Sequence, residues 1–387
     1  GMSKPKKVIF VMNNFVIGGV EKLLFDLIAR LDKQKFAISV ITVFGAGPLE
    51  ARFQELKIPI YFAAGKLPFF ADNWWYKVLW VVISPVVFVR LLGWLTYYRP
   101  AVVVTSLYQA DIFGILASWL INVKKRILIH HDVYPIGRIP TKLKKIFGVG
   151  LATTVVAVSK TVKDFVVNYF GAKPDRVKII HNGIVTEKFS IPGGSRSRLT
   201  LGMLGRLEPV KGPMVFVQAL KVLQNQFGLT PPAYLGGQGS LKPVLEEFMA
   251  RSQLSNLHLD GVITEVVPWL SKLDILVVPS ISEGFGLVVL EGLAAGKLVV
   301  ASNLPAMREL ITDGVNGCLF PVGNATVLAG SLHRLITIPV FNNQIKQGLV
   351  DWQNQQLPEY DIDQVVKNYA DLFSGSDDQV NVGEIRP

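Results

Sequence analysis

Two cationic side chains, Arg206 and Lys211, lie in one short segment bounded by glycines, Gly205–Gly212. The segment follows a β-rich run and precedes a helical pattern, so it is expected at the carboxyl end of a strand. A guanidinium and an ammonium at that edge fit a diphosphate, whose oxygens gain charge as it leaves. Gly205 permits close approach of the backbone. Taken alone, the segment also fits a solvated turn with surface cations.

A second segment, EGFGLVVLE, places two carboxylates eight residues apart, at Glu283 and Glu291. The start of the segment allows a sharp turn into a helix, whose first N–H groups favour an anion. Glu291 is expected one turn beyond the helix start, and carboxylates are good acceptors for the vicinal hydroxyls of a ribose or a hexose. Taken alone, these residues also fit a helix-dipole partner and a surface glutamate. The turn residues are Gly284, Phe285, Gly286 and Leu287.

The elements that must position these segments come in two alternating series. Residues 1–190 alternate β-rich runs, beginning with Val8–Met12, with helical patterns, and a second alternation begins at 199. The stretch 191–198 between them is rich in Gly, Ser and Pro and is the expected linker. Alternating strands and helices predict parallel sheets covered on both faces. The fold class is therefore α/β, with two doubly wound, Rossmann-like domains and a cleft at the carboxyl ends of their strands.

These motifs together resemble those of the retaining GT-B glycosyltransferases of family GT4. The resemblance rests on the Arg206–Lys211 segment and on the spacing from Glu283 to Glu291. The matching motifs occur in the same order as in the family and extend over almost the whole chain. Further matches are Gly18-Gly19-Val20-Glu21, His131-Asp132, Asn182-Gly183-Ile184, Pro279-Ser280, and the run from Glu309 through Asp313-Gly314 to Asn316-Gly317. Val185 stands where many members carry Asp, and Gly237-Gln238-Gly239 has Gln where many carry an acid.

The resemblance implies a hexosyltransferase that uses a nucleoside-diphosphate sugar, retains the anomeric configuration and needs no metal or other cofactor. Arg206 and Lys211 would hold the diphosphate, Glu291 the ribose, and Glu283 the donor sugar. Gly18 and Gly19 would bring backbone N–H groups to the phosphates. His131 would contact the sugar near the reaction centre. The predicted catalytic residues are His131, Glu283, Arg206 and Lys211. The predicted donor-binding residues are Gly18, Gly19, Gly205, Arg206, Lys211, Glu283, Gly284, Phe285, Gly286, Leu287 and Glu291.

The resemblance also assigns the domains. Residues 1–190 would form the acceptor-side domain and 199–356 the nucleotide-sugar domain, with 191–198 as the linker. Residues 357–374 would form a helix that returns to the first domain, and 375–387 a loose tail.

His130 is expected to be structural, and His181, His258 and His333 to be packing or surface residues.

The composition limits the class of protein further. The single cysteine, Cys318, excludes an internal disulfide framework and a cysteine-rich zinc module. No His or Cys spacing or obvious DxD motif supports a metal site. The apolar run Val8–Met12 is too short for the core of a secretory signal, and a cytoplasmic enzyme is expected.

The charge is unevenly distributed, and this bears on the partners. Residues 1–190 hold 26 Lys and Arg against 11 Asp and Glu, and residues 191–387 hold 14 against 18. The basic half contains an aromatic-rich stretch at 67–80, the apolar stretch Val78–Tyr98, and basic clusters at 124–126 and 138–145. Pro85 and Arg90 disfavour a transmembrane helix there, which leaves a packed helix or an interfacial one. We expect peripheral docking on the inner face of the cytoplasmic membrane and a lipid-linked or cell-envelope glycan as acceptor.

Other functions explain fewer of these sequence features. A same-fold nucleotide-sugar isomerase, a phosphorylase or a non-catalytic nucleotide-sugar-binding protein shares the predicted architecture. A dehydrogenase is disfavoured because Gly18-Gly19 lacks the complete G-x-G-x-x-G pattern. A nucleic-acid partner is not expected, because no binding motif accompanies the basic half.

Overall fold

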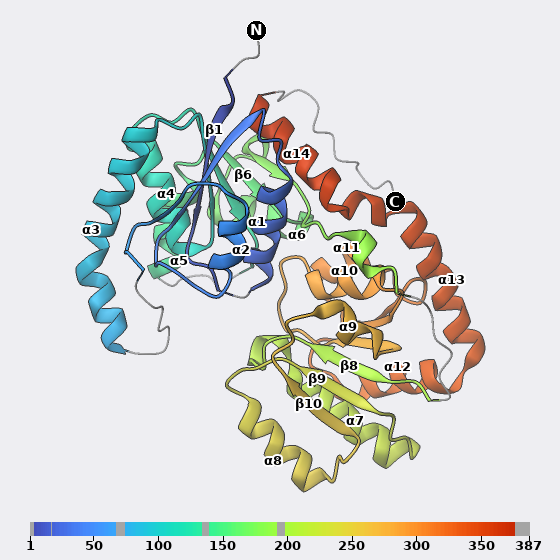
Figure 1. The fold of residues 1–387 in the computed structure, drawn as a ribbon. Coiled ribbons are helices and arrows are strands. Elements are labelled where there is room, and N and C mark those ends of the chain that lie inside the picture. Colours follow the sequence, from blue (N-terminus) through green and yellow to red (C-terminus); the bar gives the residue numbers. More distant parts are fainter. Residues whose placement is uncertain (1–3, 17, 67–73, 134–138, 192–197, 376–387) are drawn as a thin grey trace. The chain divides into compact units, whose positions relative to one another are not determined.

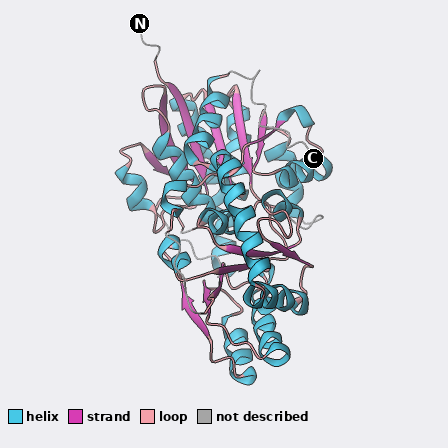
Figure 2. Cartoon of the chain, turned by 90° about the vertical axis from the view of Figure 1, so that its right-hand side faces the viewer, coloured by secondary structure: helices cyan, strands magenta, loops and turns pink. Residues whose placement is uncertain are grey.

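The computed structural model describes residues 4–16, 18–66, 74–133, 139–191 and 198–375. The chain divides into two compact units, Gly1–Gly183 with Ile362–Pro387, and Ile184–Asp361. Each unit consists of a parallel sheet with helices on its faces (Figures 1 and 2). The alternation in the sequence therefore predicted the fold class of each unit.

The first unit contains a seven-stranded parallel sheet in the order β3-β2-β1-β4-β5-β6-β7. Its core strands are buried on both faces, and Val8 to Met12 are at most 2% exposed, as their continuous apolar run predicted. The strands are β1 (Lys6–Met12), β2 (Phe36–Thr42), β3 (Ile60–Phe62), β4 (Val102–Ser106), β5 (Lys125–His130), β6 (Thr154–Ala157) and β7 (Val177–Ile179). The helices are α1 (Gly19–Arg30), α2 (Glu50–Glu55), α3 (Trp74–Tyr98), α4 (Tyr108–Leu120), α5 (Ile139–Leu143), α6 (Lys160–Phe170) and α14 (Ile362–Ser374), with a π-helical segment (Lys144–Val149) after α5 and a 3-10 turn at Pro174–Arg176.

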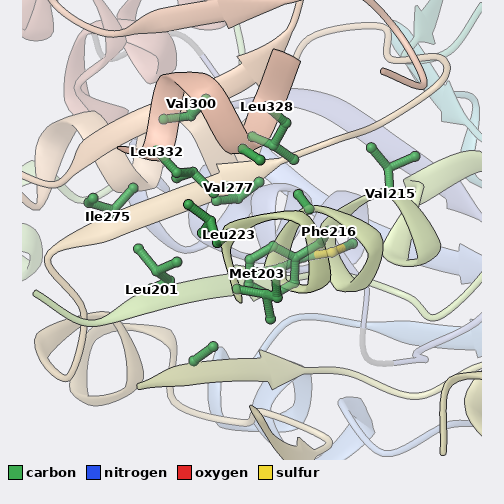
Figure 3. Close-up of a cluster of buried hydrophobic side chains, with 14 of the residues drawn as sticks. Leu201, Met203, Val215, Phe216, Leu223, Ile275, Val277, Val300, Leu328 and Leu332 are labelled. Carbon is green, nitrogen blue, oxygen red and sulfur yellow. The ribbon is translucent and has the colours of Figure 1, made fainter. Parts of the chain in front are cut away.

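The second unit contains a six-stranded parallel sheet in the order β10-β9-β8-β11-β12-β13. Apolar side chains from its strands and from four of its helices form one buried cluster, part of which is drawn in Figure 3. The strands are β8 (Leu201–Leu204), β9 (Ala233–Gly236), β10 (Leu257–Gly261), β11 (Ile275–Val278), β12 (Leu298–Ser302) and β13 (Cys318–Phe320). The helices are α7 (Pro213–Phe227), α8 (Lys242–Ser252), α9 (Val266–Ser271), α10 (Leu287–Ala294), α11 (Pro305–Leu310), α12 (Ala325–Thr337) and α13 (Pro339–Gln355), with 3-10 turns at Thr186–Phe189, Pro209–Lys211 and Leu357–Tyr360.

Both sheets reverse their strand order at one position, between β1 and β4 in the first unit and between β8 and β11 in the second. Loops that leave neighbouring strands in opposite directions open a crevice at the carboxyl edge of the sheet, where α/β proteins bind ligands. Gly18 follows β1, and the segments at 205–212 and 279–286 follow β8 and β11. The predicted donor segments therefore lie at the reversal point of the second sheet.

The final helix, α14, packs on the first unit. The ring of Phe373 meets those of Phe10 and Phe36 edge-on, with centroids 6.1 and 5.8 Å apart. The Lys125 ammonium donates to the carbonyl of Leu372 at 2.8 Å. The end of the chain thus completes the face of the first sheet.

We expected the linker between the domains at 191–198, but the division between the two units lies earlier in the chain, at 183–184. Residues 192–197 of the expected linker lie outside the described residues. Ile184 donates its N–H to the carbonyl of Tyr360 at 2.9 Å and bridges to Asp361. Phe189 is buried in the same unit. Residues 184–191 therefore belong to the second unit, and the chain crosses at 183–184 and again at 361–362.

The long apolar pattern at 78–98 forms most of α3, a 25-residue helix that contains Pro85. In the part of the chain that the structure describes, no helix combines the length and the hydropathy needed to cross a bilayer. The first part of the aromatic-rich stretch, residues 67–73, lies outside the described residues.

Candidate functional site

The first donor segment connects β8 to α7 and is held by backbone contacts. Gly212 has a φ of +67°, and a Cβ there would lie 2.0 Å from the carbonyl oxygen of Pro279. Ile281 donates its N–H to the carbonyl of Val210 at 2.8 Å. Only glycine fits position 212 without a shift, because both its backbone conformation and its contact exclude a side chain. The loops after β8 and β11 are therefore locked together.

Lys211 and Glu283 are brought into direct contact by this arrangement. The Lys211 ammonium lies 2.5 Å from Glu283 Oε1, and the two side chains are 26% and 14% exposed. The hydroxyl of Ser280 donates to the same oxygen at 2.7 Å. A cation and an acceptor-only carboxylate are thus fixed at one point of the sheet edge, where they can bind groups of opposite chemistry, a phosphate and a hydroxyl.

Glu208 belongs to the same loop, although the sequence did not single it out. Its carboxylate accepts from the backbone N–H and the hydroxyl of Ser240 at 2.8 and 2.6 Å. These hydrogen bonds, with a smaller effect of the Arg206 charge, lower the pKa of Glu208. Arg206 itself is exposed. A Cβ at Gly239 would lie 2.4 Å from the carbonyl oxygen of Leu207, so the loop after β9 also packs closely on this segment.

The second donor segment leads into α10. Gly286 precedes this helix with a φ of +89°, and a Cβ there would meet the Met307 side chain at 2.8 Å. Phe285 is buried and lies 6.1 Å from the ring of Tyr360. Glu291 is half-buried, one turn beyond Leu287. The segment therefore presents a helix N-terminus, and places a carboxylate one turn along the helix, as the spacing predicted.

In the first unit, Gly18 and Gly19 begin α1. Gly18 has an extended backbone, with a φ of −141°, so its conformation does not require glycine. A Cβ there would, however, lie 2.3 Å from a carboxylate oxygen of Glu21. Glu21 is buried, which raises its pKa. Gly18 thus leaves room for the carboxylate in the first turn of the helix.

His131 lies just after β5 and is 9% exposed. Its Nε2 shares a hydrogen bond of 2.9 Å with the hydroxyl of Ser106, and its Nδ1 is buried without a hydrogen-bond partner among the described residues. Burial, with the charge of Lys144, lowers the pKa of His131 to about 3. The imidazole is therefore neutral at physiological pH, with one nitrogen held by the fold.

A buried ion pair near this histidine was missed by the sequence analysis. Lys144 and Asp111 are 2% and 0% exposed, and their charged atoms lie 2.7 Å apart. Thr105 donates its hydroxyl to the other carboxylate oxygen at 2.8 Å. Burial raises the pKa of Asp111, against the opposing effect of Lys144. Lys144 lies in the π-helical segment, a form of helix frequent at functional sites.

The other histidines lie in packing environments. His130 stacks on Phe165, with centroids 5.9 Å apart, and meets a second ring edge-on. His181, His258 and His333 contact a backbone carbonyl, Tyr234 and Phe227 respectively. Among the described residues, His, Cys, Asp and Glu side chains do not gather in threes that could hold a metal ion.

Two family models match the chain. Residues 17–188 match the model described as Glycosyltransferase Family 4, and residues 198–337 match Glycosyl transferases group 1. A D-inositol 3-phosphate glycosyltransferase of Streptomyces bingchenggensis is 26% identical over 266 residues, 60% of this chain and 58% of the relative. An uncharacterized glycosyltransferase of Methanocaldococcus jannaschii is 32% identical over 184 residues, 47% of this chain and 49% of the relative. The chain thus spans about half the length of the curated relatives that it matches.

Solved structures share the fold over nearly the whole chain. HepE of Anabaena, crystallised with UDP and glucose, superimposes with a TM-score of 0.78 at 20% identity, covering 95% of this chain and 99% of HepE. Sucrose-phosphate synthase of Thermosynechococcus elongatus gives 0.74 at 15% identity, covering 95% and 98%. These likenesses show the two-domain GT-B fold that the motifs predicted.

Proposed function

We propose that this chain, which belongs to the group 1 glycosyltransferases of family 4, transfers a sugar from a nucleoside-diphosphate sugar to an acceptor hydroxyl. The observation that carries the proposal is the Lys211–Glu283 pair, held at 2.5 Å at the reversal point of the second sheet. A phosphate-binding cation beside a hydroxyl-binding carboxylate suits the junction between a diphosphate and a sugar.

In this proposal each residue keeps the role that the resemblance gave it. Lys211 and Arg206 neutralise the diphosphate as it leaves, together with the first N–H groups of α10 near Gly286 and Leu287. Glu291 binds the ribose hydroxyls and Glu283 those of the sugar. Gly18, Gly19 and His131 contribute from the first unit, His131 as a neutral hydrogen-bonding group.

We also propose that transfer retains the anomeric configuration and proceeds without a metal ion. The two cations and the helix N-terminus supply the positive charge that a metal would otherwise bring to the leaving group. UDP-sugars are the first donors to test, because HepE was crystallised with UDP and UDP-glucose.

The acceptor that we propose is a lipid-linked or cell-envelope glycan at a membrane surface. The support is electrostatic. The first unit holds 27 Lys and Arg against 15 Asp and Glu, whereas the second holds 13 against 14. A net positive first unit is attracted to anionic lipid or to an anionic acceptor.

The test is a panel of UDP-, GDP- and ADP-sugars with a mixed pool of glycan and glycolipid acceptors. A donor at 100 times its dissociation constant should stabilise the protein by about 2.7 kcal/mol in a thermal-shift assay. The same donor should release nucleoside diphosphate only when acceptor is present, and excess chelator should leave that rate unchanged. Release of sugar phosphate on adding phosphate would indicate a phosphorylase instead. Binding without turnover over the full acceptor pool would indicate a non-catalytic protein.

A further inference from the structure

The outer face of α3 is apolar and exposed. Val82, Val86 and Val89 are 68%, 60% and 63% exposed, and Tyr97 is 78% exposed. Their spacing places them in one stripe along the helix. The opposite face carries Val87, Leu91 and Leu95, which are at most 2% exposed and pack on the sheet. The helix is thus apolar on both faces, although only one of them is covered within the described chain.

Nothing in the described structure packs on this stripe. A Cβ at Gly93, which lies on the same face, would meet no atom within 4 Å. Helices that are apolar all round are typical of protein cores and of membranes. Exposed single apolar residues need no explanation, whereas an aligned stripe over four turns of one helix does.

Further exposed apolar residues lie on helices that pack in series with α3. Phe88 of α3 meets Phe113 of α4 edge-on at 5.8 Å, and α4 in turn packs against the π-helical segment. Beside that segment Leu143 is 40% exposed, and within it Ile146 is 56% exposed. Figure 1 shows α3 beside α4 in the first unit. We call α3, α4, α5 and the π-helical segment the outer helical layer.

The charges of this layer are almost all of one sign. Its helices contain five Lys and Arg, at positions 77, 90, 142, 144 and 145, and one acid, Asp111. Asp111 is fully buried in its pair with Lys144 and presents no charge to solvent. Exposed cations remain at Arg90, Lys142 and Lys145. Apolar side chains flanked by cations, without exposed acids on these helices, are the pattern of surfaces that bind anionic lipid.

We propose that the outer helical layer docks on an anionic lipid bilayer, with α3 lying in the interface plane. The valine stripe enters the boundary between headgroups and acyl chains, and Arg90, Lys142 and Lys145 contact the headgroups. The inference deepens the proposed function, on which it rests for the acceptor, by naming the surface and the lipid chemistry.

The experiment is co-sedimentation of the protein with vesicles of phosphatidylcholine, with or without about 30% phosphatidylglycerol. Binding is expected with the anionic vesicles only, and it should weaken between about 0.1 and 0.5 M salt. A Val86→Glu/Val89→Glu variant should lose at least about tenfold in vesicle affinity, since a charge does not enter the acyl boundary. Glutamate forms helices better than valine, so these exposed changes should leave the fold intact.

The matched control is Val350→Glu, at a 47% exposed valine of α13 in the second unit, which should bind vesicles like the wild type. Thermal shift with donor, measured without vesicles, reports the second unit's site independently and should be the same for all variants. Failure of that assay alone would count against the proposed function and not against the docking surface.

Three outcomes would overturn the proposal. The first is wild-type protein that stays in solution with anionic vesicles at low salt. The second is an equal loss of binding in Val350→Glu. The third is a wild-type dimer, seen by sedimentation equilibrium, that the Val86→Glu/Val89→Glu variant does not form, with no vesicle binding by either protein. The stripe would then be covered by a second copy of the chain.

Discussion

Replacing Lys211 by alanine is the sharpest test of the donor site. The ammonium is 26% exposed and is aligned by Glu283, so it is pre-organised for charge that develops on a leaving diphosphate. Removing one such pre-organised group costs roughly 10²–10³ in turnover, or about 2.7–4 kcal/mol of transition-state stabilisation. Stability should change by less than about 1 kcal/mol, because the pair is partly solvated and Ser280 still donates to Glu283. Arg206→Ala should cost about tenfold, since the exposed guanidinium is more strongly screened.

The assay is acceptor-dependent release of nucleoside diphosphate at saturating donor, with melting followed in parallel. Lys242→Ala, at an exposed lysine of α8, is the matched control and should leave turnover unchanged. Glu283→Gln should keep the fold but weaken use of the sugar. Near-normal turnover in an Arg206→Ala/Lys211→Ala double variant would refute the assignment of the diphosphate to these two cations.

Three further predictions concern the fold around the site. Gly212→Ala should unfold more easily and lose more turnover than Gly228→Ala in thermal melts and rate assays. The two positions share a φ near +67°, but only the Cβ at 212 meets a carbonyl oxygen, at 2.0 Å. Lys144→Met should cost about 3–5 kcal/mol in urea unfolding by stranding Asp111, and a cost below about 1 kcal/mol would contradict the buried pair. Between pH 7 and 5 the unfolded chain protonates His131 while the folded one does not, because its folded pKa is about 3. The free energy of unfolding should therefore decrease as the pH is lowered from 7 to 5. The decrease should be about 2 kcal/mol larger in the wild type than in His131→Asn.

The sequence predicted the parallel sheets and the loops that bear the donor segments. Buried parallel strands appear in the sequence as continuous apolar runs such as Val8–Met12. Gly205 directly follows a strand, and Gly212 and Gly286 directly precede helices. These signals are local, which is why they are visible in one sequence. The helix α13 was missed, although its buried residues Asn342, Ile345, Leu349 and Trp352 recur at helical spacing.

Contacts between residues far apart in the sequence could not be predicted in this way. Lys144 was counted with the surface cations at 138–145, yet it is buried against Asp111. Arg126 was counted in the cluster at 124–126, yet its guanidinium donates to the carbonyls of Val123 and Leu151 at 2.6 and 2.9 Å. Charge alone does not distinguish a solvated cation from one whose partner lies elsewhere in the chain. The docking surface proposed above therefore rests on the cations that the structure leaves exposed.

The environment of His131 limits the chemistry that it can perform. A general base works best with a pKa near the working pH, and burial together with the Lys144 charge holds this imidazole near 3. Its neutral form is thus a weak base but a stable hydrogen-bonding group, oriented through Nε2 by Ser106 and with Nδ1 uncommitted among the described residues. The buried Lys144–Asp111 pair is costly to maintain, and its cation disfavours protonation of the ring. A neutral imidazole that positions a sugar hydroxyl needs no proton transfer of its own, which fits a reaction driven by stabilisation of the leaving diphosphate. We therefore expect the pH dependence of turnover to lack an ionisation of His131 near its usual value, and His131→Asn to retain the wild-type profile at a lower rate.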